Sequence, residues 1–351
     1  MTPFIYNGLP CRVLFGFGTL AQLPAEIDRL GLKRVLVLAT PQQKSDAERT
    51  AVWLGGRAAG VFAEAAMHTP VDVTGRALAA VKALQADGTI AIGGGSTTGL
   101  GKAIALRTDL PQIVVPTTYA GSEMTPILGE TKDGAKTTQR SMQVLPETVI
   151  YDVDLTMTLP AGLSGTSGIN AIAHAVEALY AQDRNPVISM MAEDSIRALA
   201  RALPKIARDR LDRHARADAL YGAWLAGSCL GSVGMALHHK LCHTLGGSFD
   251  LPHAETHTVV LPHAVAYNAA AAPEAMTAVA RGLGVSDAAS GLYDLAGAVG
   301  ASRSLRDLGM PESGIDRATD IAMANPYWNP RPLERQPIRD LIARAWLGER
   351  P

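Results

Sequence analysis

The sequence predicts two parts: an α/β domain with a parallel sheet over residues 1–160 and an all-α domain over residues 161–351. Up to about residue 150, short β-branched runs alternate with helical stretches, a pattern typical of a parallel sheet covered on both faces. Beyond Leu159-Pro160 the strand signals end and alanine-rich segments with helical periodicity follow. A chain of 351 residues also exceeds the size at which one core usually stops growing.

Individual elements can be located in both parts. Three apolar, β-branched runs predict strands, at 35–39, 89–95 and 112–118. In the first part, helical stretches cover 74–88 and the segment after the glycines at 93–95. In the second part, helical periodicity covers 165–182, 186–208, 214–245 and 274–284.

Composition narrows the classes of protein. An apolar content of 47% with 19% charged residues describes an ordinary globule. The formal net charge of −1 argues against nucleic-acid binding, which normally needs a basic face. Three scattered cysteines exclude a disulfide framework, and we find no signal peptide and no apolar run of membrane-spanning length. We therefore expect a cytoplasmic protein without nucleic-acid or membrane partners.

A glycine turn joins the second predicted strand to a helix. Gly93, Gly94, Gly95 and Ser96 stand where glycines let backbone approach a phosphate at the positive end of the helix dipole. A dinucleotide pyrophosphate fits such a turn, so we expect a Rossmann-like, dinucleotide-binding sheet. The turn matches neither GxGxxG nor a Walker A loop, and a plain strand-to-helix turn without a ligand is the alternative.

Further polar residues follow the neighbouring strands. Thr117, Thr118 and Ser122 follow the third strand, and ligands of open α/β sheets bind at the carboxyl ends of strands. After the first strand stands Thr40, where an acid would commonly hold a ribose hydroxyl, so both NADH and NADPH are expected to be tolerated. Lys136 is a further candidate for the cofactor ribose.

Histidines mark a second candidate site. One stretch contains five of the nine histidines, namely His238, His239, His243, His253 and His257. His263 lies just beyond this stretch. Upstream, Asn170 and His174 share a helix face at i and i+4. Imidazole binds metals and exchanges protons near neutral pH. We expect function for His174, His243 and His253, and leave the others open between packing and function.

These motifs, in this order and with Asn329-Pro330-Arg331 near the end, resemble the iron-containing (group III) alcohol dehydrogenase family over nearly the whole length. The resemblance implies a divalent metal held by an aspartate and three histidines, at positions corresponding to Asn170, His174, His243 and His253. Asparagine in place of aspartate makes a poorer ligand, so we expect the metal to be absent or weakly bound.

The same segments are similar to a branch of that family that reduces the carbon–carbon double bond of 2-maleylacetate to 3-oxoadipate with NADH or NADPH in bacterial aromatic degradation. The resemblance implies a small dicarboxylate substrate and a homodimer. Our hypothesis is that His243 and His253 stabilise an enolate and deliver a proton, with His174 and Asn170 as orienting donors. Candidates for the substrate carboxylates are Lys240, Arg331 and His257, each with a surface role as the alternative.

Two other functions remain open at this point. One is a metal-dependent alcohol dehydrogenase or aldehyde reductase in which Asn170 ligates through its amide oxygen. The other is a non-catalytic nucleotide-binding sensor. Metal content and turnover distinguish them.

Overall fold

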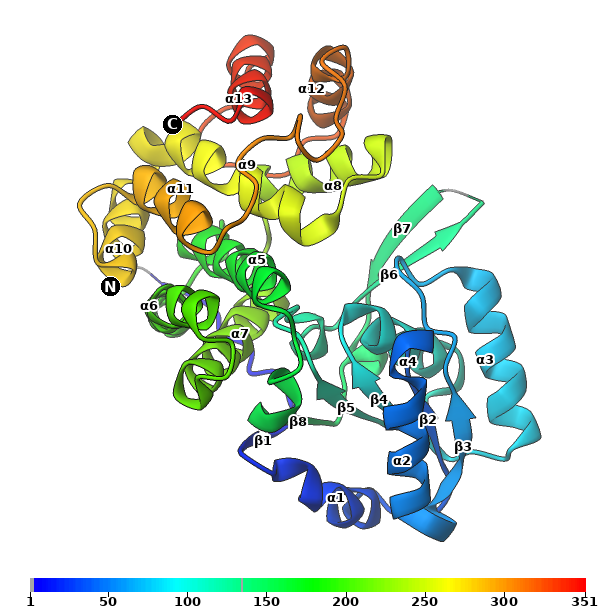
Figure 1. Ribbon diagram of the computed structural model, residues 1–351. Coiled ribbons are helices and arrows are strands. Elements are labelled where there is room, and N and C mark those ends of the chain that lie inside the picture. Colours follow the sequence, from blue (N-terminus) through cyan, green and yellow to red (C-terminus); the bar gives the residue numbers. More distant parts are fainter. Residues whose placement is uncertain (1–2, 134) are drawn as a thin grey trace. The chain divides into compact units, whose positions relative to one another are not determined.

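A computed structural model describes residues 3–133 and 135–351, without the side chains of residues 135 and 136. The chain divides into two compact units (Figure 1). The α/β unit runs from Leu9 to Leu159, and the helical unit from Pro160 to Pro351. The segment ending at Gly8 groups with the helical unit, whereas the sequence analysis assigned residues 1–160 to the α/β domain.

The α/β unit is built on a six-stranded parallel sheet, which confirms the predicted fold class. Its order is β1-β8-β5-β4-β2-β3, formed by β1 (Arg12–Gly16), β2 (Val35–Leu38), β3 (Ala58–Phe62), β4 (Gly88–Gly93), β5 (Gln112–Pro116) and β8 (Thr148–Asp152). The strands β2, β4, β5 and β8 are buried throughout, as their continuous apolar runs require. Flanking helices are α1 (Leu23–Arg29), α2 (Lys44–Leu54), α3 (Val71–Ala83) and α4 (Gly95–Thr108).

An antiparallel hairpin in this unit was not predicted. Strands β6 (Ile127–Lys132) and β7 (Ala135–Arg140) pair with each other, apart from the main sheet. The sequence between them carries the Asp-Gly dipeptide at 133–134, a strong hairpin signal. Both strands contain many polar residues, so their sequences do not show the alternation of apolar and polar residues that marks a half-buried strand.

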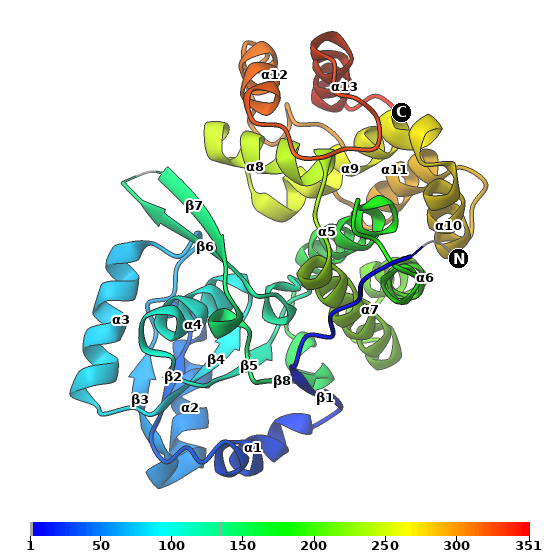
Figure 2. The ribbon, with the colours of Figure 1, turned by 180° about the vertical axis from the view of Figure 1, so that it is seen from behind.

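The second unit is all-helical in its described residues, as predicted (Figure 2). Its helices are α5 (Ala161–Tyr180), α6 (Pro186–Arg208), α7 (Arg213–Ser232), α8 (Leu237–Phe249), α9 (His253–Asn268), α10 (Pro273–Leu283), α11 (Ala288–Ala298), α12 (Gly314–Ala324) and α13 (Arg335–Leu347). Helix α5 is buried along nearly its whole length. Within the described chain no single helix is long and apolar enough to cross a membrane, and the bent pair α7 and α8 passes by length and composition only.

The predicted helical segment 214–245 is broken into α7 and α8, which meet at 95°. The start of α8 is capped by a side chain of α5: the Ala236 and His238 N–H groups donate to the two oxygens of Glu177 at 2.8 and 2.7 Å. A carboxylate suits the positive end of a helix dipole and satisfies its unpaired N–H groups. This cap brings the α8 histidines against α5.

Candidate active site

The glycine turn sits at the end of β4 as a tight strand-to-helix connection. Gly94 is the N-cap of the 14-residue helix α4. A Cβ on Gly93, whose φ is +152°, would lie 2.5 Å from Thr97 Oγ1 and 2.7 Å from Gln43 Oε1. A Cβ on Gly94 would approach Thr118 Oγ1 to 3.0 Å. Only glycine fits the first position without displacing its neighbours, and the turn leaves a helix N-terminus that can face an anion.

The carboxyl ends of β2, β4 and β5 are linked by side chains. Gln43 Nε2 donates to Thr117 Oγ1 at 3.2 Å, and Thr40 Oγ1 donates to Gln43 Oε1 at 3.4 Å. The Thr117 N–H donates to the Gly93 carbonyl at 3.0 Å, beyond the ends of the paired strands. The predicted residues Thr40 and Thr117 therefore come together through Gln43, which the sequence analysis did not select. These strand ends form the edge at which open α/β sheets bind nucleotides.

A buried lysine holds the loop after β5. Lys102 Nζ donates to the carbonyls of Ser122, Thr125 and Ile127 at 2.5, 2.7 and 2.9 Å. Burial lowers the pKa of Lys102 to about 7. The lysine fixes the backbone at the predicted Ser122. The side chain of Lys136, predicted for the cofactor ribose, lies outside the described part of the chain.

Replacing Gly93 with alanine is expected to weaken NADH binding at least tenfold, because the new methyl group displaces Gln43 and Thr97 beneath the turn. Fluorescence titration of the reduced nicotinamide measures the dissociation constant. Gly162→Ala is the matched control, since a Cβ at Gly162 meets nothing within 4 Å. An unchanged affinity in Gly93→Ala would remove the turn from the cofactor site.

The helical unit contains a buried network of histidines centred on α5 and α8. His174 Nδ1 lies 2.8 Å from His239 Nε2, and His239 Nδ1 lies 2.7 Å from Glu177 Oε2. At the other end, Asn170 Nδ2 lies 3.4 Å from His174 Nε2. All four side chains are at most 4% exposed. Burial lowers the pKa of His239 to about 3 and raises the pKa of Glu177, so burial disfavours the charged form of each partner.

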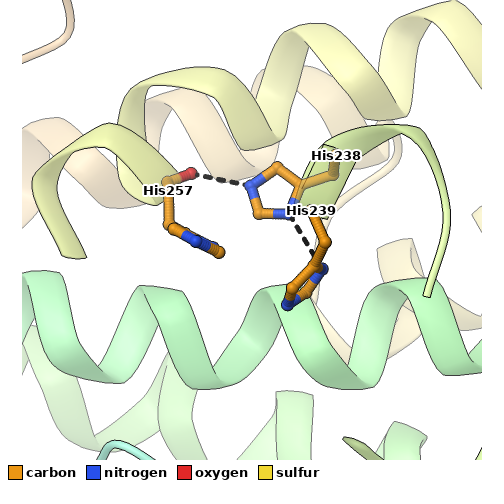
Figure 3. A group of neighbouring side chains, drawn as sticks. All are labelled: His238, His239 and His257. Atoms are coloured by element: carbon orange, nitrogen blue, oxygen red, sulfur yellow. Dashed lines mark hydrogen bonds between the residues drawn. The ribbon is translucent and has the colours of Figure 1, made fainter. Parts of the chain in front are cut away.

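Two further histidines lie within the same buried region. Figure 3 shows His238, His239 and His257 with their rings close together; the His257 centroid is 4.9 Å from that of His238 and 5.0 Å from that of His239. His238 Nε2 donates to the His257 carbonyl at 3.0 Å. Both ring nitrogens of His257 are buried and have no hydrogen-bond partner among the residues that the structure describes. Burial lowers the pKa of His238 to about 4 and that of His257 well below its usual value.

The exposed histidines His243 and His253 flank His257. His253 is the first residue of α9, and its ring lies 4.3 Å from that of His257. The His243 ring lies 6.5 Å from that of His257, and its Nδ1 is 3.3 Å from the Tyr327 hydroxyl. Lys240 Nζ lies 5.6 Å from the centre of the Tyr327 ring. Accessible imidazoles, a phenol and an ammonium thus lie near one another, and sequence reasoning missed Tyr327.

Of the positions that correspond to the family's metal ligands, Asn170 and His174 contact each other, whereas His243 and His253 both lie beside His257. Among the residues described, one ring nitrogen from each of His238, His239 and His257 lies within 4.8 Å of the other two. Both nitrogens of His239 already contact Glu177 and His174, and His238 Nε2 contacts a carbonyl. At the remaining position, Asn170 offers a neutral amide in place of a carboxylate. A neutral amide is a weaker ligand for a divalent metal than a carboxylate, so these residues would hold a metal less tightly than the ligand set that the resemblance implies.

Sequence comparison places both units in one family. Residues 10–153 match the iron-containing alcohol dehydrogenase family, and residues 164–346 match the C-terminal part of the Fe-containing alcohol dehydrogenase family. The chain belongs to the iron-containing alcohol dehydrogenase family, as its motifs predicted.

Its relatives in this family include maleylacetate reductases. That of Rhizobium sp. (strain MTP-10005) is 58% identical over 100% of both chains, and that of Sphingobium indicum is 57% identical over 99% of both. The crystal structure of maleylacetate reductase from Agrobacterium tumefaciens matches with a TM-score of 0.97 and 58% identity, covering 100% of both chains.

Proposed function

We propose that this chain reduces the carbon–carbon double bond of 2-maleylacetate to give 3-oxoadipate, using NADH or NADPH. The observation that carries the proposal is the similarity to maleylacetate reductases over the full length of both units. The site agrees with that chemistry: it offers imidazoles and an amide where the family's metal carboxylate would stand. A neutral amide does not repel a dicarboxylate substrate, whereas a carboxylate would.

The reaction is a conjugate reduction. Hydride supplied by the nicotinamide adds to the carbon β to the ketone, and the electron pair of the double bond moves to the ketone oxygen as an enolate. Hydrogen-bond donors stabilise that oxyanion, and a proton delivered to the carbon α to the ketone completes the product. His243 and His253 carry these two tasks in our proposal, because they are the exposed members of the histidine cluster.

The three candidates for binding the substrate carboxylates differ in their surroundings. Lys240 is the cation beside His243 and Tyr327, and we assign one carboxylate to it. Arg331 donates to the Tyr267 carbonyl at 3.0 Å and stacks on the Tyr267 ring, so its guanidinium serves packing. His257 is fully buried and neutral, which leaves it no charge to offer an anion.

The α/β unit binds the dinucleotide in this proposal. Gly93, Gly94, Gly95 and Ser96 take the pyrophosphate at the start of α4, and Thr40, Thr117, Thr118 and Ser122 line the neighbouring strand ends. Thr40 adds no negative charge beside a 2′-phosphate, so NADPH is accepted as well as NADH. The reaction proceeds without a bound metal, because imidazoles replace it as the stabiliser of the enolate.

We further propose a cytoplasmic homodimer. Strand β1 lies at the edge of the sheet, and an edge strand can pair with a strand from a second copy. Phe15 on β1 and Phe17 just beyond it are both partly exposed. Sedimentation at micromolar concentration tests the dimer: a species with the mass of one chain contradicts it.

Deuterium labelling tests the reaction directly. With NADH carrying deuterium at the transferred position, the product is expected to hold the label on the carbon β to the ketone, with one NADH consumed for each 3-oxoadipate. Label on a carbinol carbon would mean that the ketone itself is reduced, as a metal-dependent alcohol dehydrogenase would do. Binding of NADH without its oxidation would indicate a nucleotide sensor. Either result overturns the proposal.

A further inference from the structure

The segment 117–127, which joins β5 to β6, is held at both of its ends, and one side chain holds its far end. At its start, the Thr117 N–H donates to the Gly93 carbonyl at 3.0 Å. At its far end, Lys102 Nζ donates to three backbone carbonyls at 2.5, 2.7 and 2.9 Å and to a threonine hydroxyl at 2.9 Å. The acceptors are the carbonyls of Ser122, Thr125 and Ile127 and the oxygen Thr125 Oγ1. Lys102 therefore connects helix α4 to the end of this segment.

The direction of these backbone hydrogen bonds does not depend on the charge of the lysine. A carbonyl oxygen only accepts, so Nζ is the donor whether it is an ammonium or an amine. The Lys102 and Thr125 side chains are 0% and 2% exposed, so water has little access to replace the donor. A side chain without N–H groups at this position would leave several buried oxygens without their partner, which is costly.

Between its two ends the segment passes the first turn of α4. A Cβ on Gly94 would approach Thr118 Oγ1 to 3.0 Å, and a Cβ on Gly95 would lie 3.7 Å from the Cβ of Ala120. These glycines begin the helix at which we place the pyrophosphate. The predicted cofactor residues Thr118 and Ser122 thus lie on a segment whose far end is held by a side chain of that same helix.

We propose that Lys102 is a positioning residue of the cofactor site, which holds the segment 117–127 against the first turn of α4. The inference rests on the proposed function, in which this turn binds the dinucleotide. A lysine in a helix that follows a glycine turn is otherwise a candidate for direct contact with phosphate. Here the N–H groups of Lys102 are directed at oxygens of the segment, so the lysine acts on the cofactor through the backbone it holds.

The first test removes the donors and keeps the length of the side chain. In Lys102→Met, the dissociation constant of NADH is expected to rise at least about tenfold, because a single hydrogen bond to a charged group changes an equilibrium constant by about that factor. Fluorescence titration without substrate measures it. At saturating NADH, kcat is expected to stay within about threefold, because the proposed catalytic histidines belong to the other unit. An unchanged dissociation constant in a folded variant overturns the proposal.

A matched control separates positioning from packing. Ile104 is fully buried on α4, about 200° around the helix from Lys102, and shares its face with Gly101, where a Cβ would meet Ala91 and Leu38. Ile104→Ala leaves a cavity and is expected to lower the Tm while the dissociation constant of NADH stays within about twofold. A rise in that constant equal to the rise in Lys102→Met would assign the effect to packing and contradict positioning.

A variant on the acceptor side tests the same contact even if Lys102→Met does not fold. Thr125→Val keeps the branched shape and removes the hydroxyl that accepts from Lys102 and donates to the Ser122 carbonyl at 3.1 Å. The dissociation constant of NADH is expected to rise about three- to tenfold. If Lys102 instead contacted the phosphates directly, the loss of this acceptor would leave the constant unchanged, which would contradict the proposal.

These titrations distinguish the proposal from the proposed function. They need no substrate, so NADH binding that depends on Lys102 in a protein inactive on 2-maleylacetate would refute the proposed function and support the role of Lys102. Turnover of 2-maleylacetate with an affinity for NADH that is independent of Lys102 and Thr125 would do the reverse. Failure of the unaltered protein to bind NADH would refute both.

Discussion

Replacing His253 with alanine is expected to lower kcat for 2-maleylacetate by about 10²- to 10⁴-fold, the range lost when a general acid is removed. His253 is exposed at the first position of α9, and the neighbouring His257 is buried, so His257 cannot take over delivery of the proton. Steady-state oxidation of NADH measures the effect. Because the side chain is exposed, the variant is expected to fold normally, as circular dichroism can verify.

The control for this variant is His214→Ala, which removes an exposed histidine from α7. Its turnover is expected to match that of the unaltered protein. Near-normal turnover in a correctly folded His253→Ala protein would show that His253 has no essential role.

Replacing Asn170 with aspartate is expected to make the site bind a divalent metal more strongly and turn over the dicarboxylate substrate less efficiently. The new carboxylate is buried beside His174 Nε2, where it supplies the anionic oxygen ligand that the neutral amide lacks. Divalent metal content, measured by mass spectrometry, should rise. The same charge opposes a dicarboxylate, so kcat/KM for 2-maleylacetate should fall on the order of 100-fold, a few kcal/mol of repulsion.

Asn325→Asp controls for net charge, because Asn325 is exposed at the end of α12. Neither its metal content nor its turnover is expected to change. If Asn170→Asp gains no metal and keeps full activity, the amide is not the feature that distinguishes this site.

The sequence predicted those elements of the fold whose residues form one strong local pattern, such as a continuous apolar run. The strands at 35–39, 89–95 and 112–118 are buried on both faces, so their apolar runs were unmistakable. The break between α7 and α8 could not be predicted, because it depends on Glu177 of α5 capping a helix about 60 residues later in the chain. Such long-range contacts leave no mark on local periodicity.

The histidine site could likewise be predicted from sequence only in part. The density of histidines in the sequence indicated the region of the site, and the i, i+4 spacing indicated that Asn170 and His174 share a helix face. Sequence could not tell which histidines of α8 face α5: His239 contacts His174, whereas the predicted His243 contacts Tyr327 and is exposed. Glu177 continues the Asn170 and His174 face at i+3, a signal that could have been used. Tyr327 lies outside any regular element and gave none.

We propose that this chain reduces an enone with imidazoles and no metal. The most direct test follows NADH oxidation by chelator-treated protein with 2-maleylacetate, with metal content measured on the same sample. We expect turnover to be retained below 0.1 metal ion per chain, roughly a tenth of full occupancy, and not to rise on addition of Fe²⁺ or Zn²⁺. Turnover that is lost on chelation and returns in proportion to added metal would contradict it.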